Sequence, residues 1–288
     1  MSPVRQLLAW GTQQMGGSAD AAAEAGLLLA HVLQKDRSWL FAWPEAEVGE
    51  EDATRYRELI ARRAAGEPIA YLTGRRDFWS LQLAVDRHTL IPRPETEHLI
   101  EFVLQRLPAT RPLRVVDLGT GSGAIALALA SERPTWRITA TDRSQAALSQ
   151  ARENALRHGL QVDFVQADWL QGLQGPFDLI ISNPPYIAVG DPHLREGDPR
   201  FEPSGALLSG EDGLNDIRLI VDQARTRLAN NGWLVFEHGF EQGEACRELL
   251  QRAGYRGIGT GRDLAGHERF SYGMRDYPLD QMDFDGHD

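Results

Sequence analysis

The sequence predicts an α/β protein in which a helical region precedes a twisted, mainly parallel β-sheet with helices on both faces. Up to about residue 66, the apolar residues recur at the spacing of amphipathic helices. From residue 113 onward, short apolar runs typical of strands alternate with longer amphipathic segments. Such alternation is typical of a parallel sheet whose crossover connections are helices.

The N-terminal region predicts a small helical bundle with its own modest core. The apolar alternation of residues 74–91 then favours a two-stranded hairpin between two domains. We therefore expect a helical domain over residues 1–73, a hairpin linker over 74–92, a sheet domain over 93–275 and a disordered acidic tail over 276–288. Three helices are expected in the first domain, namely one around Leu7 and Trp10, one ending near Leu33 and one over Glu51–Ala65.

The sheet domain is expected to begin with a helix from Pro94 through Leu104. The segment from Ile187 to Glu211 has no clear period and is long for a connection, which favours a lid or a substrate wall. Strands are expected at Arg114–Leu118, Arg137–Thr141, Val162–Gln166, Phe177–Ser182, Trp233–Glu237, Tyr255–Thr260 and Arg269–Met274, and helices at Ala124–Ser131, Ser144–His158, Asp212–Leu228 and Glu241–Ala253.

Composition excludes several classes of protein. The net charge of -11 argues against general nucleic-acid binding, which needs clustered Lys and Arg. No apolar run approaches the roughly 20 residues that span a bilayer, so we expect no membrane partner. The single cysteine, Cys246, excludes an internal disulfide, fits a reducing cytoplasm and is best interpreted as a small buried apolar residue. The histidines show no metal-ligand spacing, so no metal is predicted.

A glycine-rich turn follows the first strand of the predicted sheet. Glycines allow the backbone to turn sharply and to approach a ligand closely, and this edge of an open parallel sheet is where ligands bind. Asp142 ends the next strand, where a carboxylate can accept hydrogen bonds from ribose hydroxyls or cap a helix, a role that Ser144 could share. The predicted cofactor-binding residues are Gly119, Thr120, Gly121, Ser122, Gly123, Asp142, Arg143, Asp168, Trp169 and Asn183.

These features indicate an adenosine-containing cofactor, and both NAD and S-adenosylmethionine are compatible with them. Asp168 and Trp169 offer a carboxylate and an aromatic ring for the amino group and the face of an adenine. The next motif decides between the two cofactors.

The tetrapeptide Asn183-Pro184-Pro185-Tyr186 follows the fourth strand and suits the methylation of a planar nitrogen. The lone pair of such a nitrogen is delocalised, so two acceptors on its hydrogens would both hold it and enrich it in electron density. Asn183 supplies a side-chain carbonyl and Pro184 a backbone carbonyl, and the prolines stiffen the turn. Tyr186 offers a flat face for stacking. An ordinary turn is the alternative interpretation, but hydride transfer to NAD gives this loop no comparable role.

The chain from 113 to 275 resembles the Rossmann-like methyltransferases that use S-adenosylmethionine, whose sheet has seven strands with an antiparallel last strand. The run from Leu90 to Glu97, Leu-Ile-Pro-Arg-Pro-Glu-Thr-Glu, narrows the resemblance to the peptide chain release factor N5-glutamine methyltransferases, the PrmC/HemK family. Further matching motifs are Tyr71-Leu72-Thr73-Gly74, His31-Val32-Leu33 with Trp39, Glu202-Pro203, Ala206-Leu207 and Gly210-Glu211-Asp212-Gly213-Leu214. Phe201 departs from the expected Tyr.

The resemblance implies that the acceptor is the glutamine of the Gly-Gly-Gln motif in class 1 release factors. It implies S-adenosylmethionine as the methyl donor, with Asn183, Pro184 and Tyr186 as catalytic residues and residues 183–186 as the binding site of the glutamine. The helical domain would then recognise the release factor. Adenine-N6 methylation of nucleic acid and glutamine methylation of a ribosomal protein stay open as alternatives. For Arg93 and Glu97, an interdomain ion pair and a site role are equally compatible with the sequence.

Overall fold

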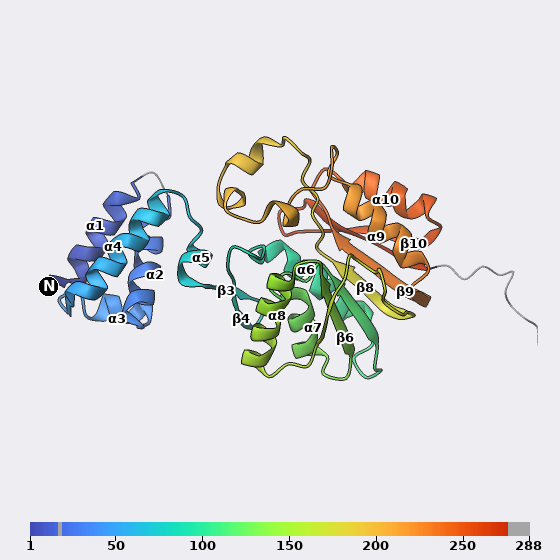
Figure 1. Ribbon diagram of the computed structural model, residues 1–288, viewed down its shortest axis with the longest axis horizontal. Helices are drawn as coiled ribbons and strands as arrows, with labels where there is room; N and C mark the ends of the chain where they lie inside the picture. Colours follow the sequence, from blue (N-terminus) through green and yellow to red (C-terminus); the bar gives the residue numbers. More distant parts are fainter. Residues whose placement is uncertain (17–18, 276–288) are drawn as a thin grey trace, which may run out of the picture. The chain divides into compact units, whose positions relative to one another are not determined.

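A seven-stranded sheet forms the centre of the larger unit in the computed structural model, which describes residues 1–16 and 19–275 (Figure 1). The strand order is β10-β11-β9-β8-β5-β6-β7, in which β11 runs antiparallel to β9 and β10. The predicted tail over 276–288 lies outside the described residues. The strands are β5 Arg114–Leu118, β6 Arg137–Asp142, β7 Asp163–Gln166, β8 Phe177–Ser182, β9 Leu228–Glu237, β10 Tyr255–Arg262 and β11 Glu268–Arg275.

Helices cover both faces of this sheet because alternate strand residues point to opposite sides. Val115 packs in one core with α6 and α7, whereas its neighbour Val116 packs in the other with α9 and α10. The seven-stranded, doubly covered sheet predicted for the methyltransferase class is thus confirmed. The helices of this unit are η1 Pro94–Thr96, α6 Glu97–Arg106, α7 Ala124–Glu132, α8 Gln145–His158, η4 Ser204–Ala206, α9 Asn215–Arg225 and α10 Gly243–Arg252.

The order of the strands creates a switch point between β5 and β8. The chain passes from β5 outward to β6 and β7 and then returns to add β8 on the other side of β5. Connections on the two sides of such a point leave in opposite directions, which opens a crevice at the carboxyl ends of the strands. The glycine-rich turn after β5 and the tetrapeptide after β8 are therefore brought to the same crevice.

A second compact unit comprises Met1–Arg75 together with Pro192–Phe201. Its core contains Leu28, Leu29 and Ile60, and the ring of Trp10 packs edge-on against that of Tyr56 with centroids 6.2 Å apart. Its elements are β1 Ser2–Pro3, α1 Val4–Gln14, α2 Ala21–Leu33, α3 Arg37–Ala42, β2 Glu47–Val48, α4 Glu50–Ala64, α5 Ile69–Thr73, η2 Pro192–Arg195 and η3 Asp198–Arg200.

The strands β3 Arg75–Phe78 and β4 Leu81–Ala84 form the expected hairpin. None of the helices among the described residues is long and apolar enough to cross a membrane.

Several observed boundaries differ from the sequence-based ones, most clearly at α3, α5 and α9. The short helices α3 and α5 were not expected, because five or six residues carry too little periodicity to reveal a helix. The helix expected over Asp212–Leu228 is shorter, because the carboxylate of Asp212 accepts the N–H of Leu214 ahead of α9. At the other end, Leu228 pairs with Phe177 of β8 and so belongs to β9, although it continues the apolar pattern of the helix.

Candidate active site

The glycine-rich turn between β5 and α7 is organised around a buried carboxylate. Asp117 Oδ2 accepts hydrogen bonds from the hydroxyl of Thr120 at 2.6 Å and from the N–H of Ala126 at 3.2 Å. Burial raises the pKa of Asp117 to about 7. Gly119 has a φ of 67°, and a Cβ at this position would approach the ring of Trp169 to 3.2 Å. Glycine therefore satisfies both the left-handed backbone and the limited space.

Asp142, at the end of β6, holds two loops together through backbone hydrogen bonds. Its Oδ2 accepts the N–H of Gly121 at 3.0 Å, and its Oδ1 accepts the N–H of Ser144 at 2.8 Å. The side chain of Ser144, not that of Asp142, caps α8 by accepting the N–H of Ala147. A carboxylate has about four acceptor sites, so Asp142 can accept further hydrogen bonds from a ligand.

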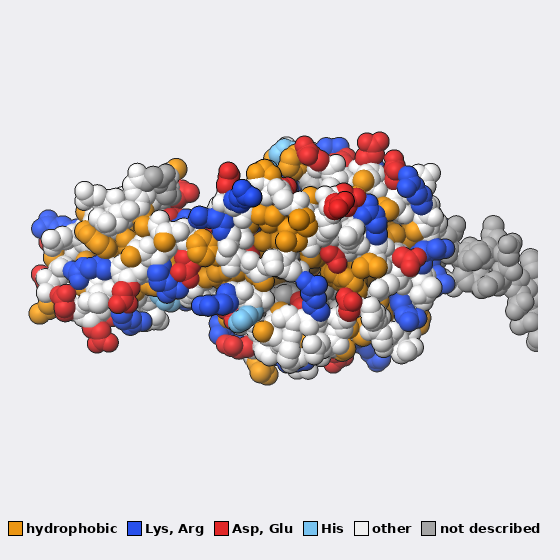
Figure 2. Space-filling view, turned by 45° about the horizontal axis from the view of Figure 1, so that its top comes forward, with side chains coloured by type: hydrophobic (Ala, Val, Ile, Leu, Met, Phe, Trp, Pro, Cys, Tyr) orange, Lys and Arg blue, Asp and Glu red, His pale blue; other side chains and the backbone are white. Residues whose placement is uncertain are grey.

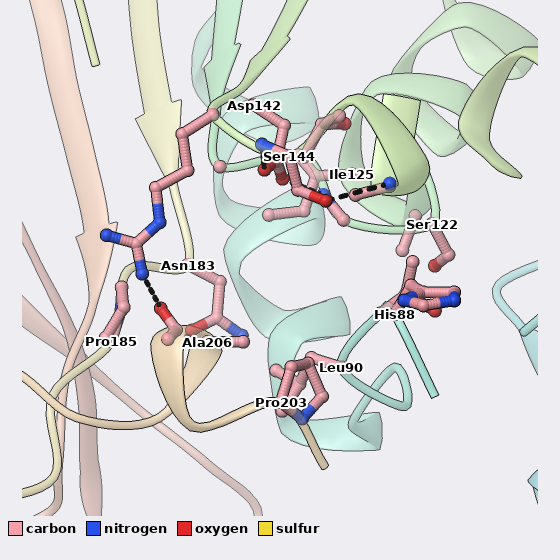
Figure 3. A pocket seen from close by; sticks show the side chains of 18 of the residues that line it. His88, Leu90, Ser122, Ile125, Asp142, Ser144, Asn183, Pro185, Pro203 and Ala206 are labelled. Atoms are coloured by element: carbon pink, nitrogen blue, oxygen red, sulfur yellow. Dashed lines mark hydrogen bonds between the residues drawn. The ribbon is translucent and has the colours of Figure 1, made fainter. Parts of the chain in front are cut away.

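A cavity of about 320 Å³ lies above these turns (Figure 3). Asp142 reaches it from the end of β6 and Asn183 from the end of β8, the two strands that flank β5. The segment around Pro203 and Ala206 borders it from another side. All but one of the predicted cofactor residues line this cavity, and the exception, Gly123, ends the same turn. The lining includes Gly119, Thr120, Gly121, Ser122, Asp142, Arg143, Asp168, Trp169, Asn183 and Pro185.

Three hydrogen bonds hold the segment over 202–206 beside the cavity. The guanidinium of Arg143 donates to the backbone carbonyl of Gly205 at 2.8 Å, which Figure 3 shows as a dashed line. Glu202 is buried, accepts the N–H of Ile91 at 3.0 Å and pairs with Arg93. Arg143 was predicted to bind cofactor, but the structure adds a bond between its side chain and the opposite wall of the cavity.

Arg93 and Glu97 have separate partners. Arg93 pairs with Glu202, whereas Glu97 accepts the backbone N–H of Trp79 at 2.8 Å. All four residues belong to the larger unit. These contacts therefore do not form the ion pair between domains that was one interpretation of the two side chains.

The tetrapeptide after β8 connects the cavity to a buried polar network. Asn183 and Pro185 line the cavity, Pro184 is buried, and the hydroxyl of Tyr186 donates to Glu237 at 3.1 Å. The side-chain nitrogen of Asn183 donates to the hydroxyl of Thr96 at 3.1 Å, and this hydroxyl donates to Glu237 at 2.6 Å. Burial raises the pKa of Glu237 to about 7, while hydrogen bonds from Thr96 and Tyr186 oppose that rise.

For several residues of this site, no role was predicted from the sequence. Thr96, Phe78 and His88 line the cavity, and Glu237 supports it from β9. Thr96 belongs to the Pro-Glu-Thr-Glu motif, so the motif marked its neighbourhood but not its role. Phe78 and His88 come from the hairpin region, where nothing in the spacing indicates a ligand.

The other notable side chains have structural surroundings. His238 is buried between the backbone carbonyl of Gly239 at 2.8 Å and the hydroxyl of Ser271 at 3.0 Å, and burial lowers its pKa. Cys246 is fully buried in a core, and burial raises the pKa of its thiol to about 12. Within residues 1–16 and 19–275, no group of three or more His, Cys, Asp or Glu side chains could hold a metal ion.

Comparisons with known proteins indicate the same family over most of the chain. The model of the PrmC N-terminal domain matches residues 6–74, and that of the methyltransferase small domain matches residues 98–197. The chain is 51% identical over 252 residues to the release factor glutamine methyltransferase of Xylella fastidiosa strain 9a5c, covering 87% of this chain and 92% of that protein. The chain belongs to the release factor glutamine methyltransferase family.

Further comparisons agree with membership of the release factor glutamine methyltransferase family. The chain is 47% identical over 262 residues to the family member of Escherichia coli strain K12, covering 90% of this chain and 94% of that protein. A methyltransferase structure from Pyrococcus furiosus matches with a TM-score of 0.53 at 19% identity, covering 75% of this chain and 98% of that one, which supports the fold alone. The family predicted from the motifs is confirmed.

The polar groups of the cavity fit S-adenosylmethionine, the cofactor of the predicted class. Asp117 Oδ1 is buried and accepts no hydrogen bond from the residues that the structure describes. Asp117 does not line the cavity itself, but its bonds to Thr120 and Ala126 shape the turn that does. Asp142 has acceptor sites left for ribose hydroxyls, and the ring of Trp169 offers an apolar face for adenine.

Proposed function

We propose that this protein transfers a methyl group from S-adenosylmethionine to the N5 amide nitrogen of the glutamine in the Gly-Gly-Gln motif of class 1 peptide chain release factors. One observation carries the proposal: Asn183 of the tetrapeptide lines the same cavity as the glycine-rich turn. An amide acceptor site and a cofactor site are thus adjacent. The name shared by the relatives, release factor glutamine methyltransferase, supports the choice of substrate.

Each half of the cavity has its own task in the proposed reaction. The turn over Gly119–Gly123 and the carboxylate of Asp142 would hold the cofactor, with Arg143, Asp168 and Trp169 beside its adenosine. Asn183 Oδ1 and the backbone carbonyl of Pro184 would accept the two hydrogens of the glutamine amide, while Tyr186 and Pro185 confine its plane. Two acceptors hold the amide and raise the electron density on its nitrogen.

Positioning supplies most of the acceleration in this proposal. S-adenosylmethionine, when bound, supplies a methyl group on a positively charged sulfur that is an excellent leaving group. The remaining task for the protein is to align a weak nucleophile, and holding two reactants in line can contribute about 7–11 kcal/mol to lowering a barrier. The products of the reaction would be N5-methylglutamine, S-adenosylhomocysteine and one proton.

The helical domain over residues 1–73 would recognise the release factor, and residues 74–92 would link it to the catalytic domain over 93–275. A partner this large needs contacts beyond one glutamine. The structure offers apolar side chains for them, since Phe41 and Trp43 at the end of α3 are 74% and 60% exposed. We place the reaction in the cytoplasm, where release factors act.

We propose no direct nucleic-acid substrate. The chain carries 41 acidic against 30 basic residues. On the face that Figure 2 shows, Lys and Arg are interspersed with Asp and Glu and do not form a basic stripe. Binding to a phosphate backbone depends on such a stripe.

Transfer of labelled methyl groups tests the proposal directly. The purified protein would be incubated with methyl-labelled S-adenosylmethionine and, in parallel, a class 1 release factor, the same factor with the Gly-Gly-Gln glutamine replaced by alanine, a large-subunit ribosomal protein fraction, and DNA or RNA. We expect label only in the unaltered release factor. Label in nucleic acid would establish the adenine alternative, and label in the ribosomal fraction alone would establish the other glutamine substrate.

A further inference from the structure

Three hydrogen bonds connect the tetrapeptide to a carboxylate that lies outside the cavity wall. Asn183 Nδ2 donates to Thr96 Oγ1 at 3.1 Å, and Thr96 Oγ1 donates to Glu237 Oε2 at 2.6 Å. The other carboxylate oxygen, Oε1, accepts the hydroxyl of Tyr186 at 3.1 Å. Glu237 therefore accepts hydrogen bonds from Thr96, which has no direct part in the proposed reaction, and from Tyr186, of which the reaction uses only the ring.

The direction of this chain follows from the chemistry of its buried end. An ionised carboxylate accepts hydrogen bonds and donates none. The hydroxyl of Thr96 has one hydrogen, which it donates in its hydrogen bond to Glu237. The oxygen of Thr96 can then only accept from Asn183, so it must face the NH₂ group of the amide and not the carbonyl.

Fixing the NH₂ group also fixes the carbonyl of Asn183. Oδ1 lies at the other end of the same planar amide and has no hydrogen-bond partner among the described residues. If the amide were turned by 180°, Asn183 would present N–H donors to the N–H donors of a glutamine amide. Without an external constraint, the two orientations of an asparagine amide have nearly the same shape.

We propose that Glu237 and Thr96 are positioning residues that determine which end of the Asn183 amide faces the acceptor nitrogen. This inference rests on the proposed amide methylation. It explains why a carboxylate is buried at this place although burial disfavours its charged form. Glu237 is only 2% exposed. A glutamine in its place could accept from one partner but would direct donors at the other.

Exchanging the carboxylate and the amide between the two ends gives a sharp test. In Glu237→Gln, the new NH₂ group must face the hydroxyl of either Thr96 or Tyr186. When it faces Thr96, the hydroxyl hydrogen of Thr96 is free to bond Asn183 Oδ1 and the Asn183 amide can turn, so we expect single-turnover methylation of the release factor to slow by about 10-fold or more. In Asn183→Asp, two carboxylates compete for one hydroxyl hydrogen, and we expect a loss at least as large. In the double variant Asn183→Asp/Glu237→Gln, the new amide at position 237 donates to Thr96, and the hydroxyl of Thr96 donates to the new carboxylate at position 183. An oxygen again faces the acceptor.

The effect of Glu237→Gln on the rate of methyl transfer should therefore have opposite signs in the two backgrounds. Glu237→Gln should lower the rate in the natural background and raise it by about 10-fold in the Asn183→Asp background, a coupling that independent sites do not show. Affinity for the cofactor, measured separately by calorimetry, should change little in Glu237→Gln. Rates that simply multiply, or a natural rate in Glu237→Gln, would overturn the inference.

Two further variants separate orientation from general damage. Thr96→Ser keeps the hydroxyl and should retain the rate within a few-fold, whereas Thr96→Val should lose at least as much as Glu237→Gln. Glu97→Gln is the matched control, since it removes the same charge next to Thr96 while its carbonyl can still accept the N–H of Trp79. Its rate should stay within about twofold of the natural one. If the unaltered protein does not methylate release factor at all, the proposed function fails and not this inference.

Discussion

The two halves of the cavity are held in place by contacts of different range. In the cofactor half, Thr120 bonds a carboxylate three residues away, and Gly121 bonds one 21 residues away. In the acceptor half, Asn183 and Thr96 are 87 residues apart, and Thr96 and Glu237 are 141 residues apart. The glycine-rich turn and Asp142 of the cofactor half thus come from one βαβ unit, whereas the acceptor half requires three distant segments to meet.

Because of this difference, substitutions in the two halves should have different effects. Backbone N–H groups and the carboxylates of Asp117 and Asp142 shape the cofactor half, so damage there should weaken cofactor binding. Side-chain hydrogen bonds with a fixed direction shape the acceptor half, so damage there should slow methyl transfer. For each variant below, the cofactor dissociation constant and the single-turnover rate are to be measured. A variant of the cofactor half that changes only the rate, or a variant of the acceptor half that changes only the affinity for the cofactor, would contradict the comparison.

The largest effect is expected for Asn183→Ala. Removing one preorganised polar contact to a transition state typically lowers turnover by about 100- to 1000-fold. The rate of release factor methylation should fall by that factor, while cofactor affinity and circular dichroism stay nearly unchanged. A rate close to the natural one would mean that residues 183–186 are only a turn.

Asp142→Ala should affect the other half. The variant leaves the ribose hydroxyls without a charged acceptor and also frees the N–H groups of Gly121 and Ser144. We expect calorimetry to show cofactor binding weakened by about 1–3 kcal/mol. Asp142→Asn, which keeps one acceptor oxygen, should lose less. Unchanged affinity in Asp142→Ala would reject this placement of the cofactor.

The rate of methyl transfer should rise with pH through about 7. Burial raises the pKa of Glu237 to about 7, so below this pH the carboxyl is increasingly protonated and cannot accept from both Thr96 and Tyr186. Arg269 opposes the rise in the pKa, and Glu95 and desolvation favour it. We expect a fall of several-fold, up to about 10-fold, at low pH. The Glu237→Gln variant, which has no titrating group at this position, should lack this transition, and a persistent transition there would assign it to another group.

Tyr186→Phe should have the smallest effect. The variant keeps the ring beside the tetrapeptide and removes only the hydrogen bond to Glu237 Oε1. We expect the rate to fall about 2- to 10-fold, the range of one buried hydrogen bond. Tyr186→Ala, which also removes the ring, should fall further. Equal rates for the two variants would mean that the hydroxyl and not the ring is what matters.

The sequence by itself determined the parts of this protein that depend on local pattern. Strand and helix periods predicted the doubly covered sheet, and the boundaries of β5 and β8 were predicted to the residue. The glycine-rich turn, Asp142 and the tetrapeptide were recognisable because each is a short motif at the end of a strand. Their convergence also followed from the sequence, because the carboxyl ends of parallel strands share one edge.

Only the tertiary structure decided the role of Glu237 and the direction of the Asn183 amide. Glu237 ends a strand that carries no motif for catalysis, and its function depends on the hydroxyl of Thr96, which the chain reaches 141 residues earlier. Local propensity cannot encode such a contact, since it arises when β9 packs into the sheet beside the segment that holds Thr96. The burial that raises the pKa of Glu237 has the same origin, because desolvation is a property of the assembled core and not of any short stretch of sequence.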